Sequence, residues 1–161
     1  MTVKEYNNCV DNFSNAVYRF ILKSLRDAEK SQDIVQDSFE KMWMNVEKID
    51  FERAKSYLFT TAYHTMIDLI RREKHKVDFE SVKLNEYSHS EHYSDIQEIL
   101  RNAVDKLPEI QKTVTLLRDY EGYSYQEIGE ITGLNESQVK VYIYRARVAL
   151  KNYIGSMETV V

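Results

Sequence analysis

The sequence is poor in the residues that interrupt helices or cross-link a chain. Its 161 residues include four glycines, one proline and one cysteine. So little glycine and proline leaves few tight turns and favours long helices. A single cysteine, Cys9, excludes both an internal disulfide framework and a zinc site built from cysteines.

Long apolar runs are also missing. No stretch approaches the roughly 20 apolar residues that span a bilayer. The first residues, MTVKEYNNCVDNF, lack the apolar core of a signal peptide. We therefore expect a cytoplasmic protein.

The composition is that of a globular chain with a slight excess of acid. Hydrophobic residues make up 43%, charged residues 30%, and the formal net charge is −4. This mixture is typical of folded proteins, and the length suits one ordinary domain or two small ones.

The hydrophobic pattern predicts an all-α fold. Apolar residues recur at spacings of three and four over residues 6–25, 33–46 and 53–72, and the helical period returns at Ile96. We expect Pro108 at the first position of a helix that runs to Tyr120 and ends at Gly122.

Residues 78–95 break this pattern. They hold five acids, four serines and one lysine without a sustained apolar period. We interpret them as a flexible acidic linker between two small helical domains, 1–77 and 96–161. The alternative is a short amphipathic helix that packs on a partner.

The second domain contains two consecutive helix-start signals. Ser124 and Glu127 have the spacing of a capping box, and Asn135 with Gln138 repeats it. Gly133 between them fits the left-handed residue that ends a helix. Two short helices joined by such a turn are the helix-turn-helix pattern, which places its second helix in the DNA major groove.

The second of these helices has an apolar and a polar face. Its apolar stripe consists of Val139, Ile143, Ala146 and Leu150. At about 100° per residue, the residues facing away from it are Ser137, Lys140, Val141, Tyr144 and Arg145. Gln138 at the edge could read an adenine. Lys140, Arg145, Arg147 and Lys151 suit phosphates, with no acid between residues 137 and 157. A purely structural helical hairpin remains the alternative.

The helix expected at 33–46 carries a row of carboxylates. Asp33, Asp37 and Glu40 lie opposite an apolar stripe made of Val35, Phe39, Met42 and Val46. Such a row could dock a basic partner, bind a metal or simply face solvent. We expect no metal, because no histidine or second carboxylate helix completes a ligand set.

The helix expected at 53–72 leads into a cationic cluster of Arg71, Arg72, Lys74 and Lys76, preceded by Tyr57, Phe59 and Tyr63. Cations and aromatic rings together are used to bind unpaired bases. We expect one or two of these rings to be exposed. Ion pairs from Asp68 to Arg71 and Arg72 would explain the cations structurally.

Three segments, in this order, resemble the extracytoplasmic-function (ECF) type of bacterial sigma factor. DIVQDSFEKMW is similar to region 2.2, and AKSYLFTTAYHTMIDLIRREK to regions 2.3 and 2.4. The segment LPEIQKTVTLLRDYEGYSYQEIGEITGLNESQVKVYIYRARVAL is similar to region 4. The resemblance covers nearly the whole chain.

The resemblance implies a non-enzymatic subunit that binds core RNA polymerase and directs it to promoters, with no cofactor or small-molecule substrate. Region 2.2 would dock on the β′ coiled-coil through Asp33, Gln36, Asp37 and Glu40. A loop at residues 47–55 and the residues Lys55, Tyr57, His64, Arg71 and Arg72 would recognise and open the −10 element. Region 4 would touch the β flap and read the −35 element through Ser137, Gln138, Lys140, Val141, Tyr144 and Arg145. The linker would thread through the polymerase, and an anti-sigma factor, often membrane-anchored in such families, is an expected partner.

The chain departs from the family pattern at several positions. His64 stands where asparagine is usual, and Val141 with Tyr142 replaces a frequent polar and basic pair. Val148 and Ala149 stand where lysines are common. These changes remove potential phosphate contacts and imply a different −35 sequence.

Two other functions are compatible with parts of the sequence. An autonomous helix-turn-helix regulator would use the second domain alone for DNA. A metal nuclease would use Asp33, Asp37 and Glu40, and His89 with His92 could bind a regulatory metal.

The acidic composition leads to a further hypothesis for the sigma-factor interpretation. The free chain would bind DNA weakly, and the polymerase would supply most of the contacts to phosphates.

Overall fold

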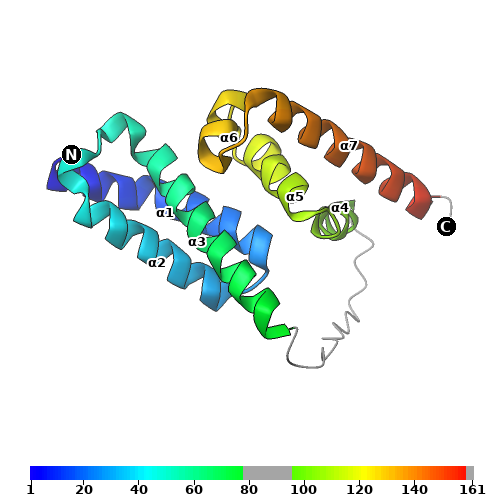
Figure 1. Ribbon diagram of the computed structural model, residues 1–161, viewed down its shortest axis with the longest axis horizontal. Helices are drawn as coiled ribbons and strands as arrows, with labels where there is room; N and C mark the ends of the chain where they lie inside the picture. The colour runs from blue at the N-terminus through cyan, green and yellow to red at the C-terminus, as the bar shows by residue number, and fades with distance from the viewer. Residues whose placement is uncertain (78–95, 159–161) are drawn as a thin grey trace.

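The computed structural model describes residues 1–77 and 96–158, and all regular elements in these ranges are helical (Figure 1). The first half contains α1 (Val3–Leu25), α2 (Ala28–Met44) and α3 (Ala54–Val77), with the 3₁₀ turns η1 (Val46–Lys48) and η2 (Phe51–Arg53) ahead of α3. The second half contains α4 (Ile96–Asp105), α5 (Glu109–Thr115), the π-helical turn η3 (Leu116–Tyr120), α6 (Tyr125–Thr132) and α7 (Glu136–Glu158). The all-α prediction is confirmed. The predicted linker 78–95, with His89 and His92, lies outside the described residues.

The first two helices begin earlier than the apolar pattern predicts, because polar caps start them. Thr2 and Glu5 form a capping box at α1, with Glu5 N donating to Thr2 Oγ1 at 3.1 Å. Arg26 ends α1 in the left-handed region, at φ 57°, and Asp27 caps α2 by accepting from Lys30 N at 3.0 Å. The second helix therefore starts at Ala28 and not at residue 33. Its first turn carries no apolar period, so the hydrophobic pattern holds no signal for this start.

The apolar side of α2 is also rotated from the predicted stripe. Phe39 and Met42 are buried as expected, but Val35 is only half-buried. Val46 is also half-buried and lies beyond the end of α2, in η1. Ile34, Ser31 and Ser38 are buried in their place, since small hydroxyl side chains allow close packing and donate to their own helix carbonyls.

Pro108 does not occupy the first helical position. Its ψ of 147° is extended, so it is the N-cap residue and Glu109 begins α5. The helix does continue to Tyr120, but its last five residues form a π-helical turn closed by Glu121 N donating to Leu116 O. Gly122 follows with φ 76°, which matches the predicted end.

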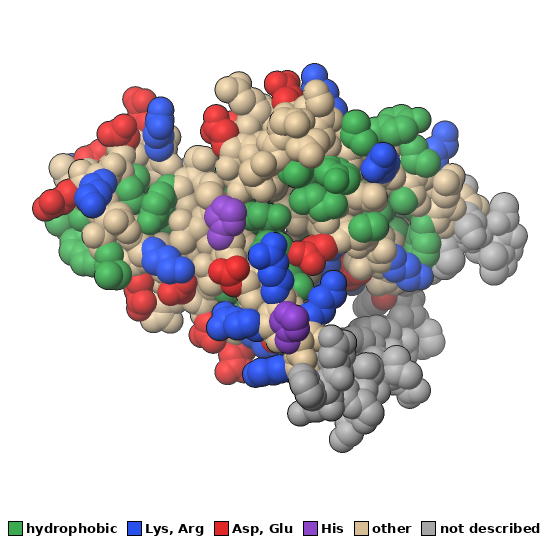
Figure 2. Space-filling model, in the orientation of Figure 1, with side chains coloured by type: hydrophobic (Ala, Val, Ile, Leu, Met, Phe, Trp, Pro, Cys, Tyr) green, Lys and Arg blue, Asp and Glu red, His purple; other side chains and the backbone are tan. Residues whose placement is uncertain are grey.

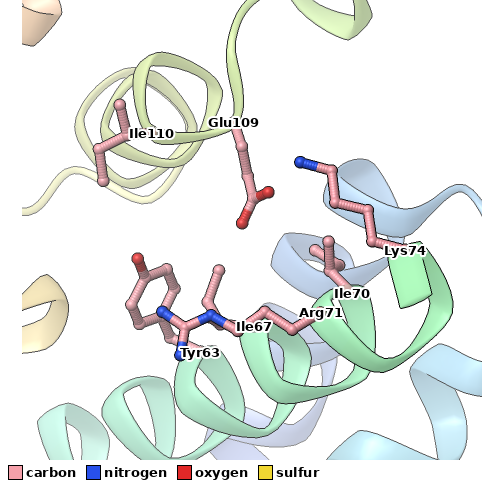
Figure 3. A pocket seen from close by; sticks show the side chains of 7 residues that line it. All are labelled: Tyr63, Ile67, Ile70, Arg71, Lys74, Glu109 and Ile110. Carbon is pink, nitrogen blue, oxygen red and sulfur yellow. The ribbon is translucent and has the colours of Figure 1, made fainter.

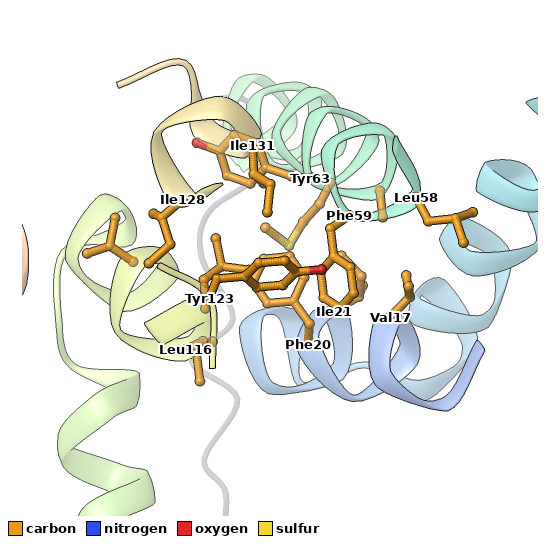
Figure 4. Close-up of a cluster of buried hydrophobic side chains, with 14 of the residues drawn as sticks. Val17, Phe20, Ile21, Leu58, Phe59, Tyr63, Leu116, Tyr123, Ile128 and Ile131 are labelled. Carbon is orange, nitrogen blue, oxygen red and sulfur yellow. The ribbon is translucent and has the colours of Figure 1, made fainter. Parts of the chain in front are cut away.

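The two halves share one hydrophobic core. Phe20 of α1 packs on Phe59 of α3, with ring centroids 5.6 Å apart, and Phe59 packs on Tyr123 just ahead of α6 (Figure 4). Ile128 and Ile131 of α6 complete this side, and α3 and α6 are in direct contact. The second half is therefore packed against the first.

Polar contacts surround this shared core. Arg19 makes two hydrogen bonds to Glu121, at 2.9 and 2.7 Å. Lys112 donates to Ser24 O at 2.9 Å and lies 3.3 Å from Asp105, which also pairs with Arg26. Burial lowers the pKa of Lys112, partly offset by Asp105. None of the helices in residues 1–77 and 96–158 is both long and apolar enough to cross a membrane.

Candidate nucleic-acid and protein interfaces

The predicted helix-turn-helix is formed by α6, Gly133 and α7. Both capping boxes are closed. Ser124 N donates to Glu127 Oε1 and Glu127 N to Ser124 Oγ, while Asn135 N donates to Gln138 Oε1 and Gln138 N to Asn135 Oδ1. Gly133 adopts φ 82°, the left-handed conformation that ends α6. The local signals in the sequence therefore set both the helix ends and the turn.

The two faces of α7 lie as the periodicity predicts. Val139, Ile143 and Ala146 are buried, and Leu150 is half-buried. The opposite side is exposed at Ser137, Lys140, Val141, Tyr144 and Arg145. Figure 2 shows hydrophobic side chains interspersed with cations over α7.

Three polar side chains of α7 already have partners. Gln138 uses its amide oxygen within the capping box, at 3.0 Å from Asn135 N. A paired reading of adenine needs both the oxygen and the nitrogen of the amide, so Gln138 would have to leave the box. Lys140 Nζ lies 3.6 Å from Glu136 Oε1, and Arg147 pairs with Asp119 at 3.0 Å.

The carboxylate row of α2 forms one surface. Asp33, Gln36 and Glu40 are exposed, and Asp37 is half-buried with an ion pair to Lys41 at 2.9 Å. At about 100° per residue these four side chains fall within about 100° of arc. The same helix ends in an exposed pair that the sequence analysis did not single out, Trp43 and Met44, which are 47% and 82% exposed. Trp43 leans on the Tyr6 ring at 5.0 Å between centroids.

The residues proposed for the −10 element do not share one face of α3. By helical position, Tyr57, His64 and Arg71 lie on one side, whereas Lys55 lies about 180° away. Lys55 Nζ is 5.0 Å from the centroid of the Tyr123 ring, so it faces the second half of the chain. Arg72 is exposed, and its Nε donates to the main-chain oxygen of Asp68.

The expectation of exposed aromatic rings on α3 was wrong. Phe59 is fully buried and Tyr63 is 8% exposed, because the second half of the chain covers that side of the helix. Tyr57 is half-buried, and its hydroxyl donates to Lys41 O at 3.3 Å.

A cleft of about 280 Å³ lies between α3 and α5 (Figure 3). Tyr63, Ile67, Ile70 and Ile110 give it apolar walls. Glu109 points into it from α5, and Arg71 and Lys74 border it on α3. Arg71, one of the two arginines proposed for the −10 element, thus also borders the junction between the two halves. In residues 1–77 and 96–158, no three His, Cys, Asp or Glu side chains are grouped to hold a metal ion.

Comparison with known proteins assigns both halves. Residues 9–76 match the family model "Sigma-70 region 2", and residues 97–150 match "Sigma-70, region 4". The RNA polymerase sigma factor SigV of Bacillus subtilis is 33% identical over 86% of this chain and 84% of its own length. The ECF RNA polymerase sigma factor SigM of the same organism is 27% identical over 86% and 88%.

The chain belongs to the ECF sigma factors of the sigma-70 family. It is therefore a non-enzymatic subunit that binds core RNA polymerase and directs transcription initiation. The nuclease interpretation is wrong on this ground. The region 2 match also argues against an autonomous regulator, which would lack that region.

Solved structures show the same fold. A Bartonella quintana sigma factor, RpoE, in complex with the anti-sigma factor NepR superposes with a TM-score of 0.78 at 23% identity, covering 95% of this chain and 98% of that one. CnrH in complex with the cytosolic domain of CnrY gives 0.68 at 20% identity, covering 94% and 88%.

Proposed function

We propose that this ECF sigma factor reads the −35 element through α7 and opens the −10 element through region 2, with domain limits at 1–77 and 96–161. The observation that carries the −35 assignment is α7 itself. Its buried stripe fixes the rotation of the helix, and its exposed side presents cations and no acid between residues 137 and 155. A cationic helix after a tight turn is what enters a major groove.

Region 2 docks on the β′ coiled-coil of the core enzyme through Asp33, Gln36, Asp37 and Glu40. The support is their common, largely exposed face on α2. Carboxylates on a partner surface steer association with a basic patch and set its salt dependence. Region 4 touches the β flap. The protein acts in the cytoplasm, where the polymerase works.

The −10 element is opened along the face of α3 that carries Tyr57, His64 and Arg71, with Arg72 beside it. Extruding a base costs a few kcal/mol, which stacking and cationic contacts to the backbone must offset. Tyr57 and His64 supply rings on this face, and Arg71 and Arg72 supply charge at its end. Lys55 lies on the opposite side of α3, over the Tyr123 ring, so it reaches DNA from that side and only after its contact with Tyr123 has been broken.

Binding to both elements requires regions 2 and 4 to separate. By their position numbers the −10 and −35 elements lie about 25 base pairs apart, which is roughly 85 Å of duplex at about 3.4 Å per base pair. In the structure α3 packs directly on α6. The packed form is therefore the state before promoter binding. An anti-sigma factor is the partner that holds the chain in an inactive state, as the complexes of RpoE with NepR and of CnrH with CnrY suggest for their own chains.

The test is a selection from a duplex library that is randomised at both promoter elements. The library is offered to the chain alone, to bacterial core polymerase alone and to the mixture, with heparin as competitor. We expect heparin-resistant complexes and sequence enrichment only in the mixture. Enrichment at both elements supports the assignment of regions 2 and 4. Specific binding by the chain alone, unchanged by core enzyme, would contradict the proposal.

A further inference from the structure

The exposed side of α7 carries two large apolar side chains in the part that would enter the groove. Val141 is 44% exposed and Tyr144 is 70% exposed. They are three residues apart, so they are neighbours on the helix surface and lie about 60° apart around it. Burying these two side chains against a partner removes apolar area from water. This favours a partner that has an apolar group opposite Val141 and Tyr144.

Fewer polar side chains around this pair are available to contact DNA than the sequence suggests, because two of them already have partners within the chain. Gln138 is held in the capping box through its amide oxygen, and Lys140 pairs with Glu136. Ser137 and Arg145 remain on either side of Val141, at about 40° each. The N-terminal half of α7 thus presents an apolar centre between one hydroxyl and one guanidinium.

The surrounding charge favours DNA over an apolar protein surface. The charged side chains between residues 137 and 155 are Lys140, Arg145, Arg147 and Lys151, all basic. A polyanion matches this side, and phosphates would flank the apolar pair. Within the major groove only thymine offers an apolar group, its C5-methyl.

We propose that Val141 and Tyr144 form an apolar slot for thymine methyl groups, so that the −35 element of this sigma factor is specified partly by methyl contacts. The inference rests on the proposed role of α7 as the −35 reader. Val141 contributes its two methyl groups, and the Tyr144 ring forms the second wall. The position is one where the family more often has a polar residue, which is why this chain would select a different base.

The experiment uses the reconstituted holoenzyme and the −35 duplex enriched by selection. Each thymine of that element is replaced singly by uracil, which removes the C5-methyl group alone. We expect at least one uracil to weaken binding about fourfold, the effect of one buried methyl-sized group at about 0.8 kcal/mol. In Val141→Ala that uracil should have little further effect, because the contact is already lost.

Val148→Ala is the matched control. Val148 is 42% exposed on the same helix, but it lies seven residues beyond Val141, toward the C-terminal half. The Val148→Ala holoenzyme should keep the full uracil penalty.

Specific selection with no uracil effect, or with the same penalty in Val141→Ala, would overturn the inference while leaving the proposed function intact. Loss of core binding in Val141→Ala without any uracil effect would identify the pair as a protein contact and would also overturn it. Failure to select any −35 sequence would reject the inference and the proposed function together.

Discussion

The ring of Phe59 on α3 meets the ring of Tyr123 edge-on, with centroids 5.1 Å apart and an angle of 71° between planes. Phe59 belongs to region 2 and Tyr123 to region 4, so this contact joins the two sigma regions. Tyr123 is 4% exposed, and burial raises its pKa strongly. Its hydroxyl has no hydrogen-bond partner among the described residues, so the ring and not the hydroxyl makes the contact.

Replacing Tyr123 by alanine should therefore separate regions 2 and 4. Truncating a buried aromatic side chain lowers the free energy of unfolding by roughly 3–5 kcal/mol. At Tyr123 much of this loss should weaken the contact between regions 2 and 4. Small-angle scattering should show a larger radius of gyration for Tyr123→Ala. Tyr123→Phe is the control: it keeps the ring and removes an unpaired polar atom, so the chain should stay compact and at least as stable. A compact Tyr123→Ala would mean that other contacts suffice to hold the junction.

The ion pair between Arg19 and Glu121 should contribute to the same junction through its charges. The Glu121 side chain is only 3% exposed, while Arg19 is 47% exposed, so the pair is partly screened. We expect Arg19→Glu to enlarge the chain in scattering at low salt, because two carboxylates then face each other. Adding Glu121→Arg should restore the compact form, with a coupling of about 1 kcal/mol for a half-exposed pair. If the exchange restores nothing, the charges are not what matters at this position.

The carboxylate face of α2 should control affinity for core polymerase. Glu40→Lys with Asp33→Lys reverses two exposed charges and should weaken binding of core enzyme by about tenfold or more at low salt, less at high salt. The measurement is competition with the unaltered sigma factor for core enzyme. Asp11→Lys reverses one charge at an exposed site of α1 and should leave the affinity nearly unchanged, whereas Glu40→Lys alone, the same change in charge, should already weaken binding. Equal effects at both places would indicate net charge and not a docking face.

The sequence predicted what local signals determine. Ser124, Gly133 and Asn135 set helix ends through contacts within a few residues, and the stripe from Val139 to Ala146 sets the rotation of α7. It could not predict which apolar residues of different helices meet. The pattern groups Phe59 with Tyr57 and Tyr63 as rings that could meet unpaired bases. Nothing in its neighbourhood indicates Tyr123, which lies 64 positions away in the chain.

The same limit affected the site residues. Lys55 is basic and near the expected −10 loop, so pattern alone assigns it to DNA, whereas in the packed form it faces Tyr123. Gln138 satisfied two patterns at once, a cap and a base reader, and only the hydrogen bond from Asn135 N shows that its oxygen serves the cap. The exposure of a side chain and its contact partners depend on how the helices pack, which a local sequence pattern does not determine.

The capping box of α6 should give region 4 a defined pH dependence. The hydrogen bond from the backbone N–H of Ser124, and to a smaller extent the one with its side chain, lower the pKa of Glu127 below its ordinary value of 4.5. Its stabilising contribution is therefore complete above that value and is lost as the pH falls through the lower pKa of the folded state. Glu127→Gln should be less stable than the parent at neutral pH, and the difference should vanish in acid.

Urea unfolding at both pH values measures this difference. Glu130→Gln, at an exposed site of the same helix, should differ little from the parent at either pH. A constant deficit for Glu127→Gln at all pH values would point to packing and not to the charge.

Two glycines in helices should respond oppositely to the same substitution. A Cβ at Gly129 of α6 would lie 2.6 Å from the main-chain oxygen of Leu134, whereas at Gly155 of α7 nothing lies within 4 Å. Alanine is favoured over glycine inside a helix by roughly 0.5–1 kcal/mol, so Gly155→Ala should leave stability equal or higher. Gly129→Ala must push the turn of the helix-turn-helix away, and we expect a net loss of about 1–3 kcal/mol.

Urea unfolding compares the two variants, and promoter binding by the holoenzyme shows whether α7 has moved. Gly129→Ala should weaken −35-dependent binding, because α7 follows directly from the displaced turn, while Gly155→Ala should bind as the parent does. Equal stability of the two variants would mean that residues 133–135 can shift without cost. The close approach of α6 to the turn would then not be required for the position of α7 in the DNA complex.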